Sequence, residues 1–140
     1  MIGCSQPILL KMAKAIRKNH SIKEQLILRV ITELPDQIII QLAKKWQTRG
    51  LKYPVRAENF FRQLLMASKI SQRKQKPKAP LMILASEKDK IVHPDCSRKI
   101  AKTWKMPVIT HSQAGHDVAL DDPEWIIQQL DKFLKKNKPN

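Results

Sequence analysis

Five consecutive apolar residues, Leu81–Ala85, constrain the fold of this 140-residue chain more than any other stretch. A continuous apolar run without alternation predicts a strand that is buried on both faces, as in a parallel sheet. A helical pattern over Asp95–Lys105 follows it, and then a second short apolar run over Pro107–His111. A strand, a helix and a strand in this order predict a right-handed β-α-β unit with parallel strands.

Two residues that could carry chemistry follow the two predicted strands. Asp89 lies in the polar turn Ser86–Pro94, and His116 lies in the tetrapeptide Ala114–Asp117. Carboxyl ends of neighbouring parallel strands meet at one edge of the sheet, where α/β proteins place their active sites. A carboxylate there can fix an imidazole so that its other nitrogen takes a proton from a nucleophile. On spacing alone, a structural aspartate beside a solvated histidine is an equally good interpretation.

The residues before and after this unit predict amphipathic helices, because their apolar residues recur at helical spacing. Ser21 and Glu24 have the spacing of a capping box, Pro35 suits the first turn of a helix, and Gly50 suits a helix end. In the last helix, Asp122 is a capping acid followed by a proline at the first helical position. The predicted helices cover Pro7–Asn19, Ser21–Leu34, Pro35–Gly50, Ala57–Ser68 and Pro123–Lys136.

The clearest boundary in the sequence is the polar, cationic and proline-containing segment 71–80. It divides the chain into a helical region with a basic linker, residues 1–79, and a β-α-β unit with a C-terminal helix, residues 80–140. The fold class that we predict is therefore α/β, with helices preceding a parallel β-α-β unit.

The formal net charge of +15 is unevenly distributed. Residues 1–79 contain 17 Lys and Arg against 4 Asp and Glu, whereas residues 80–140 contain 10 against 8. A basic region can attract nucleic acid or an acidic surface. These charges are spread over several helices with few aromatic residues among them, so we prefer a solvated basic surface and keep nucleic-acid binding as the alternative.

The cysteines and the hydropathy suggest a compartment. Cys4 and Cys96 lie far apart and outside any C-x-x-C spacing, which favours reduced thiols in a reducing environment. Lys11 and Lys14 interrupt the N-terminal apolar residues, and no apolar run reaches the roughly 18 residues that a membrane span needs. We therefore expect a cytoplasmic protein without a membrane span.

Metal and cofactor sites have no sequence signal. The histidines show no metal-ligand spacing, and no glycine-rich loop for phosphates is present. We expect no cofactor and no metal. The four histidines are His20, His93, His111 and His116.

The residues around both candidates resemble those of the α/β-hydrolase family. Pro80–Pro94 is similar to that family's buried strand, short turn, acid and Val-x-Pro, and Ala114–Asp117 with the apolar helix after it is similar to its histidine loop. The helical block resembles the cap inserted between the family's sixth strand and its acid-bearing strand. The resemblance implies a partial α/β-hydrolase fold, with Asp89 as the triad acid and His116 as the general base. At Ser86 the family often has glycine.

The family's serine nucleophile lies in G-x-S-x-G, at a sharp turn between a strand and a helix. No such pentapeptide occurs in this sequence, because Gly3-Cys4-Ser5 lacks the second glycine. We therefore expect the C-terminal half of a hydrolase, as a truncated product, a split enzyme or a mis-called start, with little activity alone. Completed by an N-terminal half, the resemblance implies a small acyl substrate of the ester, thioester or amide class.

A sheet of two strands also leaves open edges, which a complementing chain or a second copy of this chain could cover. Three hypotheses follow. The first is the hydrolase half. The second is a non-enzymatic module whose basic helices, residues 7–70, bind nucleic acid or an acidic partner. The third is a degenerate fragment without activity.

Overall fold

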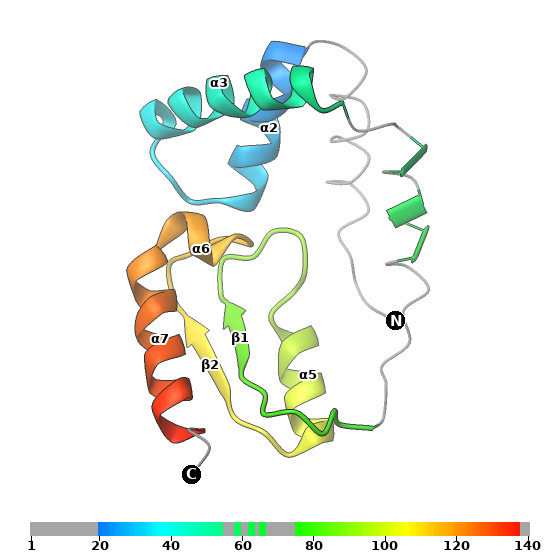
Figure 1. Cartoon of the computed structure of the whole chain (residues 1–140), viewed down its shortest axis with the longest axis vertical. Helices are drawn as coiled ribbons and strands as arrows, with labels where there is room; N and C mark the ends of the chain where they lie inside the picture. The colour runs from blue at the N-terminus through cyan, green and yellow to red at the C-terminus, as the bar shows by residue number, and fades with distance from the viewer. Residues whose placement is uncertain (1–19, 55–57, 60–61, 64, 67–74, 138–140) are drawn as a thin grey trace.

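The computed structural model describes residues 20–54, 58–59, 62–63, 65–66 and 75–137. In this part of the chain a helical hairpin precedes a parallel pair of strands with helices around it (Figure 1). The helix predicted over 7–19 lies outside the described residues, and the helix predicted over 57–68 lies partly outside them. The elements are α2 (His20–Ile31), α3 (Asp36–Lys52), β1 (Ile83–Ser86), α5 (Asp95–Trp104), β2 (Val108–His111), α6 (Val118–Asp121) and α7 (Pro123–Lys136).

The parallel β-α-β unit is confirmed. β1 and β2 pair in parallel, from Ile83 opposite Val108 to Ser86 opposite His111, and α5 connects them and contacts both. The predicted strand ends were wrong at residues 81–82 and at Pro107, which lie outside the strands. In the same register Pro107 would stand opposite Met82, and proline has no N–H to donate to a ladder.

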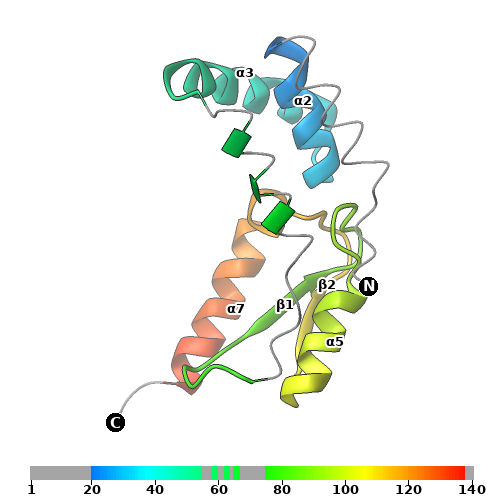
Figure 2. The same cartoon turned by 90° about the vertical axis from the view of Figure 1, so that its right-hand side faces the viewer.

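The two long helices of this unit lie on opposite sides of the strand pair in both views (Figures 1 and 2). The predicted start of α7 is confirmed, because Asp122 accepts a hydrogen bond from the Trp125 N–H at 2.9 Å and Pro123 is the first helical residue. α7 nevertheless leaves several large apolar side chains exposed. These are Ile127, Leu130 and Leu134.

The α2–α3 hairpin has an apolar core of its own. Leu28 is 0% exposed and packs with Ile39 and Ala43, and Leu120 of α6 is half-buried against them. The hairpin lies at the end of the molecule toward which both strands point, with α6 between (Figures 1 and 2). It therefore covers the carboxyl ends of β1 and β2.

Both predicted helix ends in the hairpin were wrong. α2 ends at Ile31 rather than Leu34. Pro35 disfavours a helical conformation at Leu34, and the Ile31 carbonyl accepts from the Asp117 N–H instead of from its own helix. α3 continues through Gly50 to Lys52. A glycine inside a helix costs only about 1 kcal/mol, and the proline at position 54 ends the helix instead.

No helix in the described ranges is long and apolar enough to cross a membrane.

Candidate active site

Asp89 lies in the loop that follows β1, and its carboxylate is held by the chain around it. Oδ1 accepts hydrogen bonds from the backbone N–H groups of Ile91 and Val92, both at 2.8 Å. Aspartate commonly makes such local bonds at turns, which is why this sequence forms a tight loop here. The side chain is 12% exposed, and its second oxygen, Oδ2, remains available for another partner.

That partner is His116, in the loop that follows β2. Nδ1 of His116 lies 2.8 Å from Oδ2 of Asp89. Because an ionised carboxylate only accepts hydrogen bonds, Nδ1 carries the proton, and Nε2 of the neutral ring presents its lone pair. Within the described ranges nothing hydrogen-bonds to Nε2, and the side chain is 40% exposed. The structure thus places the two residues singled out from the sequence side by side; their catalytic role stays a prediction.

The contact shifts the pKa of both groups. The hydrogen bond to Asp89 raises the pKa of His116, more strongly than partial burial lowers it. Burial alone would raise the pKa of Asp89, but the hydrogen bonds from His116, Val92 and Ile91 outweigh it, and the net shift is downward. Both shifts favour an imidazolium paired with a carboxylate, the charge state that a general base reaches after it takes a proton.

The pair borders an open hollow of about 380 Å³. Its wall is mainly apolar and comes from β1, α5, α6 and α7, so an acyl group or a packed segment of polypeptide could occupy it. Apart from the pair, the lining residues are Leu84, Ala85, Ser86, Val92, Pro94, Ser97, Val118, Ala119 and Ile126.

Ser86 was predicted to lie in a turn, and this was wrong. It is the last residue of β1, it is 5% exposed, and its hydroxyl donates a hydrogen bond to the carbonyl oxygen of Ala114. The ladder continues here because the Glu87 N–H donates to the His111 carbonyl at 3.0 Å. Ser86 therefore ties the end of the acid-bearing strand to the histidine loop, a role that glycine could not fill.

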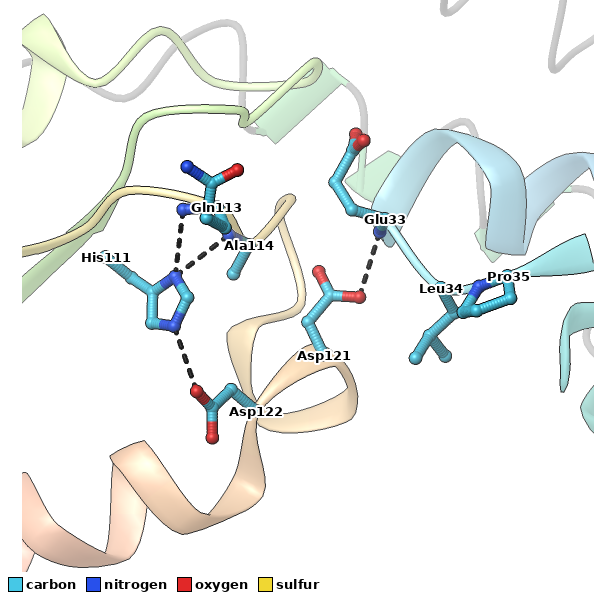
Figure 3. Close-up of a pocket in the computed structure, with 8 residues that line it drawn as sticks. All are labelled: Glu33, Leu34, Pro35, His111, Gln113, Ala114, Asp121 and Asp122. Carbon is cyan, nitrogen blue, oxygen red and sulfur yellow. Dashed lines mark hydrogen bonds and ion pairs between the residues drawn. The ribbon is translucent and has the colours of Figure 1, made fainter.

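A second histidine–aspartate pair, which the sequence analysis missed, shapes the histidine loop (Figure 3). Nε2 of His111 lies 3.1 Å from Oδ2 of Asp122, and Nδ1 accepts from the N–H groups of Ala114 at 2.9 Å and Gln113 at 3.2 Å. The ring also meets Trp125 edge-on at 4.9 Å. Both nitrogens of His111 are engaged, so this ring organises the loop and has no nitrogen available for catalysis.

Asp121 and Asp122 accept three more hydrogen bonds, all from backbone N–H groups. The carboxylate of Asp122 accepts the Trp125 N–H, and this bond, together with the one to His111, lowers the pKa of Asp122. Asp121 accepts from the Gly115 N–H at 2.6 Å and, across the molecule, from the Glu33 N–H at 2.9 Å (Figure 3). No sequence pattern marks the contact between Asp121 and Glu33, because the two residues lie 88 positions apart.

The remaining candidates form no further site among the residues that the structure describes. Here no group of three His, Cys, Asp or Glu side chains could hold a metal ion. Cys96 is a free, half-buried thiol, and His93 is an exposed loop residue whose Nδ1 accepts from the Asp95 N–H at 3.3 Å. Cys4 lies outside the described residues.

Comparison with known proteins finds a solved structure with a similar fold. No protein-family model matches the chain, and no curated protein matches it. A solved structure, described as a "putative lipase" from Acinetobacter baumannii AYE, is similar with a TM-score of 0.65 and 20% sequence identity, over 93% of this chain and 45% of that chain. At this identity the likeness concerns the fold. This chain spans less than half the length of the protein that it matches.

Proposed function

We propose that this chain is the acid-and-base part of an α/β-hydrolase-type serine hydrolase, and that it acts on an ester, thioester or amide when a serine nucleophile is supplied. The observation that carries the proposal is the 2.8 Å contact between Nδ1 of His116 and Asp89. The two residues follow adjacent parallel strands, and no residue that the structure describes hydrogen-bonds to Nε2 of His116. That arrangement suits a general base better than a structural histidine, whose two nitrogens would both be engaged, as in His111.

In the proposed reaction Nε2 of His116 removes the proton of the serine hydroxyl as the serine oxygen attacks the acyl carbon. The imidazolium that forms is stabilised by the carboxylate of Asp89. His116 then gives the proton to the leaving alcohol, thiol or amine, and the acyl group stays on the serine. Water, deprotonated by the same nitrogen, then attacks the acyl carbon. The bond to the serine breaks, His116 returns the proton to the serine oxygen, and the acid leaves. The raised pKa of His116 favours the first proton transfer.

The fold supports acyl chemistry as the reaction class. This chain is similar in fold to part of the structure described as a "putative lipase", and the matched part includes nearly all of this chain. The nucleophile of such enzymes lies in G-x-S-x-G, which the printed sequence does not contain. The proposal therefore assigns the serine to another segment or another chain that completes the fold.

The test supplies that serine. The chain is co-produced with a segment from the same source that carries an apolar strand followed by G-x-S-x-G, and the hydrolysis of p-nitrophenyl acetate and butyrate is measured. Turnover should need both chains and should be lost in His116→Ala and Asp89→Asn. His93→Ala is the matched control, because His93 is an exposed histidine of the same half. Full turnover in His116→Ala would refute the proposal.

A further inference from the structure

The hairpin turn, residues 31–33, comprises the last residue of α2 and the two residues after it. It contacts both loops that carry the candidate catalytic residues. The carboxylate of Glu33 forms an ion pair with Lys90, the residue after Asp89. The backbone N–H of the same Glu33 donates to Oδ1 of Asp121 at 2.9 Å (Figure 3). One residue of the hairpin is therefore bonded to the acid loop through its side chain and to the segment beyond the histidine loop through its backbone.

Both peptide neighbours of His116 are connected to that turn. The Gly115 N–H donates to Oδ2 of Asp121 at 2.6 Å, so the Asp121 carboxylate joins Gly115 to Glu33. On the other side of His116, the Asp117 N–H donates to the Ile31 carbonyl at 2.8 Å. The backbone is thus fixed immediately before and immediately after His116.

The turn is itself firmly anchored in the hairpin. Thr32 is 2% exposed, and both its hydroxyl and its backbone N–H donate to the Leu28 carbonyl at 2.9 Å. Leu28 is completely buried in the hairpin core. A position fixed to this turn is therefore fixed to a packed element and not to a loose loop.

The contact between the turn and the histidine loop is close enough to require glycine. A Cβ added at Gly115 would lie 2.9 Å from the Ile31 carbonyl oxygen and 3.2 Å from Thr32. Backbone atoms cannot move aside as a flexible side chain can. The two segments therefore form one close-packed joint around the Asp121 carboxylate.

We infer that Asp121 is a positioning residue: by joining the hairpin turn to Gly115, the residue before His116, it sets where the His116 imidazole lies relative to Asp89. A carboxylate suits this task, because each of its two oxygens accepts one N–H and hydrogen bonds to an ionised acceptor are the stronger kind. An asparagine at this position could accept only one of the two. That Asp121 positions His116 does not depend on the proposed function, whereas the consequence for catalysis rests on it.

The experiment observes the His116 imidazole directly, by nuclear magnetic resonance of the full chain. Two-bond ¹H–¹⁵N spectra report which imidazole nitrogen carries the proton and give the pKa. In the wild type, His116 should be the Nδ1–H tautomer, with a pKa above the ordinary value of about 6.5. In Asp121→Ala and Asp121→Asn the Nδ1–H form should become a mixture of tautomers, and the pKa should fall toward that value.

Two further variants separate positioning from charge. Asp131→Asn removes the same charge from an exposed position of α7 and should leave the His116 spectrum unchanged. Gly115→Ala keeps every charge but pushes the joint apart, and it should shift the tautomer in the same direction as Asp121→Ala. If Asp121→Ala does not fold, the His116 spectra of Asp121→Asn and Gly115→Ala test the inference.

A wild-type tautomer and pKa in Asp121→Asn and Gly115→Ala would overturn the inference, whatever the activity. Conversely, an altered His116 spectrum together with full turnover in His116→Ala would refute the proposed function and leave the positioning role intact. In the active assembly, Asp121→Asn should lower kcat about tenfold with little change in KM, because a misplaced base affects the transition state and not substrate binding.

Discussion

The hydrophobic residues that the hairpin buries include large ones, whereas those that the strand unit buries are small. Among the described residues the largest fully buried side chains, Leu28 and Thr32, both belong to the hairpin end of the molecule. The buried hydrophobic residues of the strand unit are all alanines. Large apolar side chains are exposed on α7, as others are on α2 and α3. The buried alanines are Ala85, Ala101 and Ala114.

Hydrogen bonds to carboxylates take the place of a large apolar core in the loops of the strand unit. Asp89, Asp117, Asp121 and Asp122 each accept at least one backbone N–H, and together they define the path of the chain around His116. Such bonds are directional, so they fix positions more closely than apolar contacts of the same free energy. The comparison teaches that the packed hairpin supplies rigidity and the polar loops transmit it to the candidate site.

The largest expected effect concerns the site itself. In the completed enzyme, Asp89→Asn should reduce kcat/KM for p-nitrophenyl butyrate about 10⁴-fold, because it removes the charge that fixes the His116 tautomer. The unfolding midpoint of the chain should change little by comparison, since the hairpin core is untouched. A loss of activity below about tenfold would mean that Asp89 has a structural role.

The next prediction compares the two kinds of burial. Leu28→Ala should lower the free energy of unfolding by about 3 kcal/mol, the ordinary cost of a cavity at a fully buried leucine. Ile127→Ala on α7 should change it by less than about 0.5 kcal/mol, because this side chain is already 58% exposed. Urea unfolding followed by circular dichroism measures both, and equal effects would show that the isoleucine is covered in solution.

Two glycine substitutions should change the stability of the chain in opposite directions. Gly115→Ala should destabilise the chain by about 1–3 kcal/mol, the usual cost of overpacking, because the new methyl group meets backbone. Gly50→Ala should stabilise it by about 0.5–1 kcal/mol, since the position is helical and a Cβ there would lie an ordinary 3.6 Å from Glu24. Thermal unfolding of both variants tests this, and destabilisation by Gly50→Ala would contradict it.

The smallest effect is the pH dependence of stability that the Asp89–His116 pair contributes. Because the pKa of His116 is raised, its contribution is fully present below about 6.5 and is lost as the pH rises through the raised value. Because the pKa of Asp89 is lowered, its contribution is present above about 3.9 and is lost as the pH falls through the lowered value. The pair therefore contributes most between these limits.

The amount should be about 1 kcal/mol or less, because His116 is 40% exposed and water screens the contact. Urea midpoints of the wild type and His116→Gln at pH 5.5 and pH 9 measure it. Between pH 9 and pH 5.5, the urea midpoint of the wild type should rise relative to that of the variant. If the urea midpoint of the wild type exceeded that of His116→Gln by more at pH 9 than at pH 5.5, the histidine would be neutral over this whole pH range.

Local patterns predicted what depends on neighbours in sequence. The run at Leu81–Ala85 indicated strand β1, although Ile83 and Leu84 are only half-buried in it. Asp122 with Pro123 indicated the start of α7, because a helix cap lies within a few residues of the helix that it begins. Asp89 and His116 could be singled out because each follows a predicted strand. The four-residue helix α6 was missed, since it is too short to show a period.

What could not be predicted depends on residues far apart in the chain. The hydrogen bond between Asp121 and Glu33 spans 88 positions, and no local sequence pattern near either residue predicts it. The ends of the hairpin helices were misplaced for a related reason: Ile31 uses its carbonyl oxygen for the Asp117 N–H, and Gly50 is tolerated within a helix whose core comes from α2. Tertiary packing overrides propensity at such positions.

The junction between α6 and α7 has a consequence for how the gene can be altered. Asp122 ends one helix through its N–H to Val118, begins the next by accepting from Trp125, and holds His111, so one residue serves three partners without a spacer. A peptide tag or a cleavage sequence spliced in at this point would separate all three at once. Laboratories that wish to label, cut or circularly permute this polypeptide should open it elsewhere on its surface.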